Sequence, residues 1–148
     1  MSKFNLVKKS NLHRDLIFKI STDVENFHNV MPEYFKSLKI IQNSSNEKIV
    51  LESIDFLGRK IEIKTKHVII PPNLHEVFIL NGPAKGTSFI EKYESNPTGT
   101  DISISVDLKL NGFLKLIPFL KLLLFKKMNS VMSEFIVCAE SYSKSVSK

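Results

Sequence analysis

The stretch FLKLIPFLKLLLFKKMNSVMSEFIVCAESY, residues 113–142, carries one line of apolar residues at steps of three and four. The line consists of Phe113, Ile117, Leu120, Leu124, Met128, Val131, Phe135, Cys138 and Tyr142. Such steps keep side chains on one face of an α-helix, so the stretch predicts a long amphipathic helix. If the regular helix begins near Leu116, Pro118 falls within its first two turns, where the missing N–H costs little.

A membrane-spanning helix is a poor interpretation of the same stretch. A helix that crosses a bilayer needs roughly 20 apolar residues with few charges. Here Lys115 and Lys121 interrupt the apolar run, and Lys126 and Lys127 end it. We therefore expect this helix to cover the core of a soluble protein.

The first half of the stretch is more apolar than one packed face requires. Leu116, Phe119, Leu122 and Leu123 project away from the main line. Residues 108–133 also contain five lysines and no acidic residue. Two interpretations stay open: these side chains meet other parts of the core, or they form a partly exposed, basic, apolar lip at the entrance of a binding site.

Upstream of residue 111 the apolar period changes along the chain. Residues 13–35 have helical spacing with a break near 21–23, which predicts two short helices. Alternation with a period of two predicts strands at residues 4–10, 35–43, 47–58, 59–70, 74–80, 86–95 and 101–110. A seven-stranded antiparallel sheet with one apolar face must cover that face, and the long helix is the only element large enough. A curled sheet around a helix leaves a cavity, and such cavities commonly hold small apolar molecules.

This order resembles the helix-grip fold of the START, birch-pollen-allergen and polyketide cyclase superfamily. The segments that carry the resemblance are IFKISTDVENFHNVMPEYF, FIEKYESNPTGTDISISVDLKL and the terminal SEFIVCAES. It implies an α+β fold, a seven-stranded curved antiparallel sheet wrapped around a long C-terminal α-helix, with two short helices between strands 1 and 2. Members bind hydrophobic or amphipathic ligands between sheet and helix, and a minority are enzymes. Phe89 stands where a Trp is common in the family.

Length and composition limit the other classes of function. The 148 residues predict one domain, 1–148, and the N-terminus does not resemble a signal peptide, so a cytoplasmic location is expected. Cys138 is the single cysteine, which leaves no intramolecular disulfide. The net charge is +6, but all but two of the 21 basic residues are lysines and they do not alternate with aromatic residues, which argues against nucleic acid. The excess charge lies in the last 40 residues, which favours an anionic ligand group or transient contact with a membrane surface.

No motif for phosphate binding, metal binding or nucleophilic catalysis occurs, so neither a cofactor nor a metal is expected. His67 follows apolar residues on one face of its strand and could meet His75 across a turn, although a satisfied or exposed histidine is the commoner case. Glu91 shares a face with Phe89 and Tyr93; the rarity of buried carboxylates favours a surface ion pair for it. If buried, His67, Glu91 and Tyr93 are the candidate acid–base residues.

The remaining site candidates come from the presumed inner faces. The ligand-binding candidates are Ile63, Thr65, His67, Phe78, Leu80, Phe89, Glu91, Tyr93, Ile104, Val106, Phe113, Ile117, Leu120, Leu124 and Met128. Lys115, Lys121 and Lys126 are the candidates for binding an anionic group.

The leading hypothesis is a monomeric or weakly dimeric protein that binds a lipid, an isoprenoid or quinone, or an acyl thioester resembling acyl-CoA. The alternatives are a cyclase or isomerase that uses polar residues in the same cavity, and a protein-interaction module of the co-chaperone kind.

Overall fold

The computed structural model describes residues 3–56 and 58–146, and the side chains at positions 36, 54–56 and 113 lie outside this description. The elements are β1 (Lys3–Ser10), α1 (Arg14–Thr22), the 3₁₀ turn η1 (Val24–Asn26), α2 (Phe27–Val30), β2 (Phe35–Asn43), β3 (Glu47–Phe56), β4 (Arg59–Ile70), β5 (Leu74–Ile79), β6 (Ser88–Asn96), β7 (Gly99–Asp107), the 3₁₀ turn η2 (Gly112–Leu116) and α3 (Leu120–Val146). This order confirms the predicted α+β arrangement of one strand, short helices, six strands and a long C-terminal helix.

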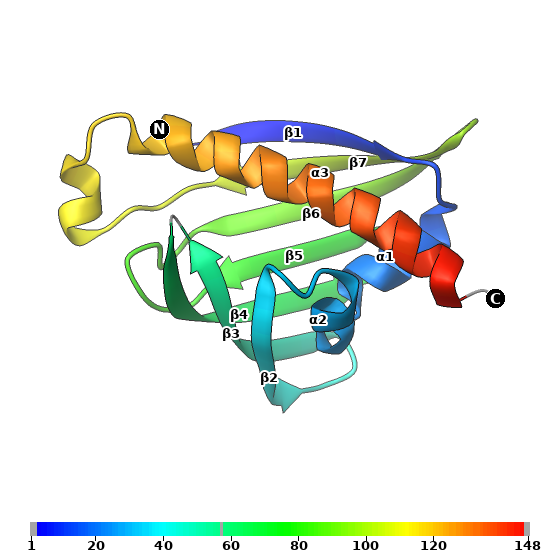
Figure 1. Cartoon of the computed structure of the whole chain (residues 1–148), viewed down its shortest axis with the longest axis horizontal. Coiled ribbons are helices and arrows are strands. Elements are labelled where there is room, and N and C mark those ends of the chain that lie inside the picture. The colour runs from blue at the N-terminus through cyan, green and yellow to red at the C-terminus, as the bar shows by residue number, and fades with distance from the viewer. Residues whose placement is uncertain (1–2, 57, 147–148) are drawn as a thin grey trace.

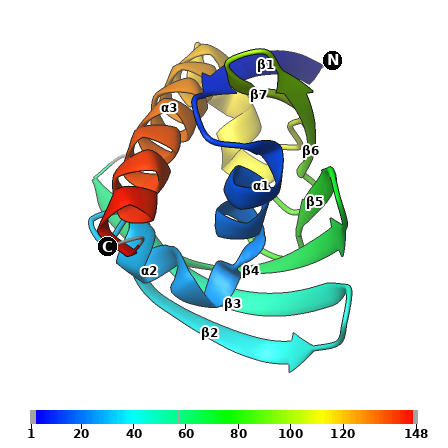
Figure 2. The same cartoon turned by 90° about the vertical axis from the view of Figure 1, so that its right-hand side faces the viewer.

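All seven strands form one antiparallel sheet in the order β1-β7-β6-β5-β4-β3-β2. Strands β2 to β7 therefore follow one another as a meander, and β1 pairs with β7 at the far edge. The sheet curves strongly, and α3 runs diagonally across its concave side (Figure 1). Viewed along the molecule, the strands wrap around an interior that α1 and α2 close at one end, while η2 and the start of α3 lie at the other end (Figure 2).

The strand register defines the inner face, the one toward α3. Directly opposed residues of antiparallel strands point to the same side of a sheet. Ile104 opposes Leu6 on one side and Glu91 on the other, Glu91 opposes His75, and His75 opposes Ile69. Leu6 and Ile104 are buried in the core cluster that also contains Ile136 and Ala139 of α3. These opposed residues therefore lie on the inner face.

The main core lies between β1, β6, β7, α1 and the second half of α3. Ile17 is fully buried there, and Phe18 packs edge-on against Tyr93 with 5.2 Å between ring centroids. A smaller cluster of Leu108, Leu120 and Leu124 fixes the first half of α3 against the end of β7. The first half of α3 is also held by Phe125 and Met128, which pack on the main core while remaining partly exposed.

The long helix begins later than the sequence predicts. Its first residue is Leu120, preceded by η2 and a turn at Pro118 and Phe119. A proline disfavours helical backbone at the residue before it, and Ile117 is extended with φ −81° and ψ 116°. The prediction of a regular helix from about Leu116 is therefore wrong, and Ile117 does not lie on α3.

Candidate functional site

A polar network crosses the inner face of the sheet from β3 to β6. It consists of Glu52, Thr65, His67, His75, Glu91 and Tyr93, each at most 9% exposed. Strand pairing places Thr65 and His67 beside inner-face residues of β5, and it places His75 directly opposite Glu91. Alternation along each strand therefore brings these side chains together beneath α3.

The network is a continuous chain of hydrogen bonds. Nδ1 of His67 lies 3.0 Å from Nε2 of His75, and Nδ1 of His75 lies 2.9 Å from Oε1 of Glu91. The Tyr93 hydroxyl donates to the same carboxylate oxygen at 2.7 Å. At the other end, Nε2 of His67 is 3.1 Å from Oγ1 of Thr65 and 3.5 Å from Oε1 of Glu52. Two imidazole rings are thus lined up between two carboxylates.

The hydrogen bonds limit where protons can reside. We assign a proton to Nδ1 of His75 because that atom faces a carboxylate, and a second proton to the contact between the two rings. Nε2 of His67 can then accept from the Thr65 hydroxyl. One further proton would allow the same nitrogen to donate to Glu52. The pair of rings can therefore take up or release one proton, which is the requirement for acid–base chemistry.

Burial and charge shift the pKa values of this network. Burial lowers the pKa of His67 below 6.5, although its hydrogen bond to Glu52 acts in the opposite direction. Burial by itself would raise the pKa of Glu91, but its interactions with His75 and the hydrogen bond from Tyr93 outweigh burial and lower that pKa below 4.5. Burial and the Glu91 charge raise the pKa of Tyr93 well above 10. Nearby, burial and the Glu52 charge raise the pKa of Tyr34 to about 12.

The apolar part of the inner face is only half-buried near one end of the sheet. We call Ile63, Val77, Ile79 and Phe89 the open apolar face; all four lie on the inner side by register and remain partly exposed. Phe89 opposes Val106 near the end of β7, and Ile79 opposes Thr65. This end of the sheet is the one beside η2, opposite to α1 (Figures 1 and 2).

A groove of about 620 Å³ lies at the same end, between β1, the end of β7, η2 and the start of α3. Four of its lining residues are lysines: Lys3, Lys109, Lys115 and Lys121. Leucine side chains and Ile117 supply apolar walls, and Asp107 is the one acidic residue among the lining residues, 3.6 Å from Nζ of Lys109. We call this the lysine groove.

Two polar side chains hold the wall of the lysine groove in place. The Thr87 hydroxyl accepts from the Lys109 backbone N–H at 2.9 Å and lies 3.2 Å from its carbonyl oxygen. The Asn111 backbone N–H donates to the Pro83 carbonyl at 2.8 Å, and its side-chain amide lies 3.2 Å from the Lys85 carbonyl. The loop between β5 and β6 is therefore fastened to the segment that leads from β7 into η2.

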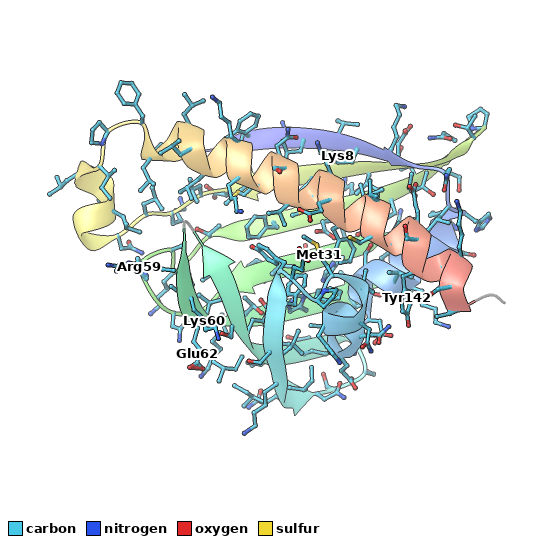
Figure 3. The ribbon with its side chains drawn as sticks, in the orientation of Figure 1. Lys8, Met31, Arg59, Lys60, Glu62 and Tyr142 are labelled. Carbon is cyan, nitrogen blue, oxygen red and sulfur yellow. The ribbon has the colours of Figure 1, made fainter. Side chains whose placement is uncertain are left out.

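The residues that project from the helical line are exposed. We call Leu116, Phe119, Leu122 and Leu123 the apolar lip; they are 83%, 79%, 52% and 49% exposed. The interpretation that they meet other parts of the core is therefore wrong. They lie at the end of the molecule where η2 joins α3, the end toward which Arg59 also projects (Figure 3).

The structure divides the predicted ligand-binding residues into several groups. Ile63 and Phe89 belong to the open apolar face, and half-buried Met128 packs on the core from α3. Ile117 and Leu120 line the lysine groove. The residues packed in the core or the polar network are Thr65, His67, Glu91, Tyr93, Ile104, Val106 and Leu124. The side chain of Phe113 lies outside the described residues.

Some predicted placements are wrong. Phe78 opposes Lys66 and Ser88, so it lies on the outer face, and Leu80 follows the end of β5 with its N–H donating to the Lys64 carbonyl. Both faces of this strand are apolar, so its alternation could not identify the inner one. The interpretation of Glu91 as a surface ion pair is also wrong, because its partners are buried His75 and Tyr93.

Sequence reasoning missed several residues of the site. Val77 and Ile79 of the open apolar face are not among the predicted residues, which name the adjacent Phe78 and Leu80 instead. Glu52 has the pattern of an ordinary strand carboxylate; the register sets it on the inner face opposite Ile63, and its contact with His67 at 3.5 Å follows only from the three-dimensional structure. Of the three anion-binding candidates, Lys115 and Lys121 line the lysine groove, and Lys126 is exposed on α3 outside it.

The described part of the chain holds neither a metal-binding cluster nor a helix that could span a membrane. Among residues 3–56 and 58–146, no group of three or more His, Cys, Asp or Glu side chains is arranged to hold a metal ion. Within the same residues no helix is both long and apolar enough to cross a membrane.

Comparison with known proteins gives similarity in structure only. No family model and no curated protein sequence matches the chain. Among solved structures, TTHA0849 from Thermus thermophilus is similar over 99% of both chains, with a TM-score of 0.80 and 14% identity. A START superfamily protein from Mycobacterium smegmatis has a TM-score of 0.79 and 12% identity, over 95% of this chain and 98% of that one. The Zhui aromatase/cyclase from Streptomyces sp. R1128 has a TM-score of 0.72 and 13% identity, over 93% of both chains.

These likenesses agree with the features found in the chain itself. A seven-stranded antiparallel sheet curves around the long helix α3, and short helices join β1 to β2. The chain therefore has the helix-grip fold, which it shares with the START superfamily protein and the aromatase/cyclase to which it is similar.

Proposed function

We propose that the chain is a cytoplasmic, single-domain protein that binds a hydrophobic or amphipathic small molecule between the sheet and α3. The ligand classes that fit are a lipid, an isoprenoid or quinone, and an acyl thioester. Binding keeps the apolar part of such a molecule out of water and so supports transport or sequestration.

The observation that carries this proposal is the incomplete burial of the open apolar face. Elsewhere on the inner face the side chains of Tyr93, Ile104 and Val106 are at most 2% exposed, because they pack in one core cluster with residues of α1 and α3. Ile63, Val77, Ile79 and Phe89 lie on the same face and remain partly exposed. Apolar area left in water costs about 25 cal/mol per Å², so an apolar ligand on this face would be stabilised by removing that area from water.

The charge of the lysine groove supports a ligand with an anionic end. Lys3, Lys115 and Lys121 line it, and Lys109 is the lysine that faces Asp107. The groove is at the same end of the sheet as the open apolar face. A ligand could bury its apolar chain on that face while its carboxylate or phosphate forms ion pairs with the lysines of the groove.

The proposal extends to how the protein meets its ligand. The entrance to the ligand site would be the lysine groove, which lies beside the apolar lip. Transient contact of this end with a membrane surface would allow exchange of a poorly soluble ligand. The protein would act as a monomer or weak homodimer, since a ligand held within one sheet and one helix needs no second chain.

The test is binding of stearate, an apolar chain with an anionic end, followed by isothermal calorimetry and native mass spectrometry of the purified protein. Val77→Phe fills space at the open apolar face and should abolish binding. Val68→Phe is the matched control, since Val68 is half-buried on the outer face of the adjacent strand and opposes Glu76. Equal affinity of both variants, or a protein that binds neither stearate nor any co-purified molecule, would contradict the proposal.

Lys121→Glu should weaken stearate binding in a salt-dependent manner, because exposed charges act through a field that salt screens. Lys92→Glu, on the exposed outer side of β6, is the control for the change in net charge. Similar losses in both variants would mean that the groove does not bind the carboxylate.

A second candidate is an acid–base enzyme of the cyclase or isomerase kind, with His67, Glu91 and Tyr93 as acid or base. The chain of hydrogen bonds from Thr65 through His67, His75 and Glu91 to Tyr93 favours it, since a proton can move along it. This use requires a substrate that reaches the network. Nitrogen-15 NMR of the His67 and His75 rings would test it: a change of tautomer or of titration on adding stearate supports contact, and unchanged ring signals in the bound protein exclude it for that ligand class.

A further inference from the structure

One segment beside the entrance exposes apolar side chains that folding does not explain. The four residues of the apolar lip leave on the order of 400 Å² of apolar surface in water, a size at which exposed patches commonly mark an interaction site. All four lie between the last residue of η2 and the first turn of α3, at the end of the molecule opposite to α1.

The backbone at Phe119 adds an independent observation. Phe119 has φ 59°, and it is the one described residue other than glycine with a positive φ. A bulky residue is disfavoured in this left-handed region because its Cβ crowds the following carbonyl. Glycine would relieve that crowding, yet a phenylalanine with 79% of its surface exposed occupies the position. Such strain at an exposed aromatic residue points to a role in binding.

The charges around the apolar lip identify its partner. Lys115, Lys121, Lys126 and Lys127 lie among the lip residues or within the next turn of α3, and residues 108–133 contain no acid. The acidic residue among those that line the adjoining lysine groove is Asp107, whose Oδ1 lies 3.6 Å from Nζ of Lys109. Apolar side chains ringed by lysines match the boundary of an anionic bilayer, where apolar groups enter the acyl region and cations meet the phosphates.

We propose that the apolar lip docks the protein on an anionic lipid bilayer, with the Phe119 ring inserted below the phosphates and the lysines above them. The proposal identifies the membrane surface that the entrance of the proposed ligand site would face. The reason for docking, which is ligand exchange, rests on the proposed function. The orientation places the lysine groove against the bilayer, so a ligand could pass between membrane and protein without crossing water.

The chain contains no tryptophan, so a single introduced tryptophan reports its own surroundings. In Phe119→Trp, fluorescence should shift to the blue on adding phosphatidylcholine vesicles that contain phosphatidylglycerol, and lipids brominated on the acyl chain should quench it. Val137→Trp is the matched control, because Val137 is 61% exposed on α3 but lies away from the lip. Its emission should not change.

Vesicle flotation of further variants separates the contribution of apolar insertion from that of the lysine charges. Phe119→Gly, which also relieves the backbone, should weaken binding at least about tenfold through lost apolar burial. Lys121→Glu should weaken it about fivefold or more, only when phosphatidylglycerol is present, and Lys92→Glu should not. No flotation of the wild type, or equal quenching at positions 119 and 137, would overturn the proposal. So would a dimer, seen without lipid by sedimentation, that Phe119→Gly abolishes, because the lip would then bind a second copy.

Stearate binding measured without vesicles distinguishes this inference from the proposed function. Stearate binding with no vesicle binding would overturn docking alone. Vesicle binding with no stearate binding would overturn the ligand and leave docking in place.

Discussion

Leu123 and Leu124 are adjacent leucines of α3 with opposite surroundings, and replacing each by alanine should have very different effects. Leu124 is 3% exposed and packs with Leu108 and Leu120, whereas Leu123 is 49% exposed in the apolar lip. Truncating a fully buried leucine costs about 2–5 kcal/mol. At Leu123 the same three carbons, at about 0.8 kcal/mol each when fully buried, are only half shielded, so the loss should be about 1 kcal/mol.

Because both substitutions change helix propensity equally, their difference isolates burial. Urea denaturation should show a free energy of unfolding lower by at least about 2 kcal/mol in Leu124→Ala and by about 1 kcal/mol in Leu123→Ala. Leu116→Ala, at a residue 83% exposed, should stay within about 0.5 kcal/mol of the wild type. Leu116→Ala and Leu123→Ala should nevertheless weaken ligand uptake from vesicles. Equal destabilisation at 123 and 124 would refute the exposure of the lip and its role at the entrance.

Three further predictions concern the backbone and the polar network. Phe119→Gly should leave the free energy of unfolding within about 1 kcal/mol of the wild type, because relief of the backbone strain at φ 59° offsets the greater conformational entropy of glycine in the unfolded chain. A larger loss in urea denaturation would contradict the exposed position of Phe119. Gly99→Ala should lower the free energy of unfolding by at least about 2 kcal/mol, because a Cβ there would lie 2.1 Å from the Ser10 carbonyl oxygen. Gly82→Ala, with open space around it, should lower it by about 1 kcal/mol. Similar unfolding midpoints of the two variants would be inconsistent with this turn geometry. The pKa values of His67 and Glu91 are lowered in the folded protein, so the stability that they contribute is present above the unfolded values of 6.5 and 4.5 and is lost as pH falls through the folded values. Urea midpoints should therefore drop on acidification, and Glu91→Gln should flatten the drop below about pH 4.5. Parallel plots of urea midpoint against pH for Glu91→Gln and the wild type would argue against the charged carboxylate.

Much of the fold could be predicted from the sequence because most elements have a pattern that only one structure satisfies. The alternation of residues 59–70 matches β4 from end to end, and Ile102, Ile104 and Val106 are the buried apolar positions of β7. The start of α3 was misplaced because the apolar spacing continues through Pro118, while the backbone restriction that proline places on Ile117 ends the helical geometry there.

The candidate site was only partly predictable, for reasons that differ between residues. His67 could be placed inward because Ile61, Ile63 and Thr65 share its face. The partners of Glu91 depend on cross-strand register, which sets it opposite His75 and which alternation within one strand cannot provide. On β5, Phe78 and Val77 are both apolar, so the choice of inner face had no local signal.

The most direct test of binding between sheet and helix is a methyl NMR spectrum of the protein with stearate that carries a doxyl spin label near its chain end, compared with unlabelled stearate. If the chain lies on the open apolar face, the label should broaden the methyl signals of Ile63 and Ile79 and leave those of Val68 and Ile70 sharp, because the latter two lie on the outer face of β4. Broadening of Val68 and Ile70 to the same extent, or of neither pair at saturating stearate, would contradict a ligand held inside the sheet.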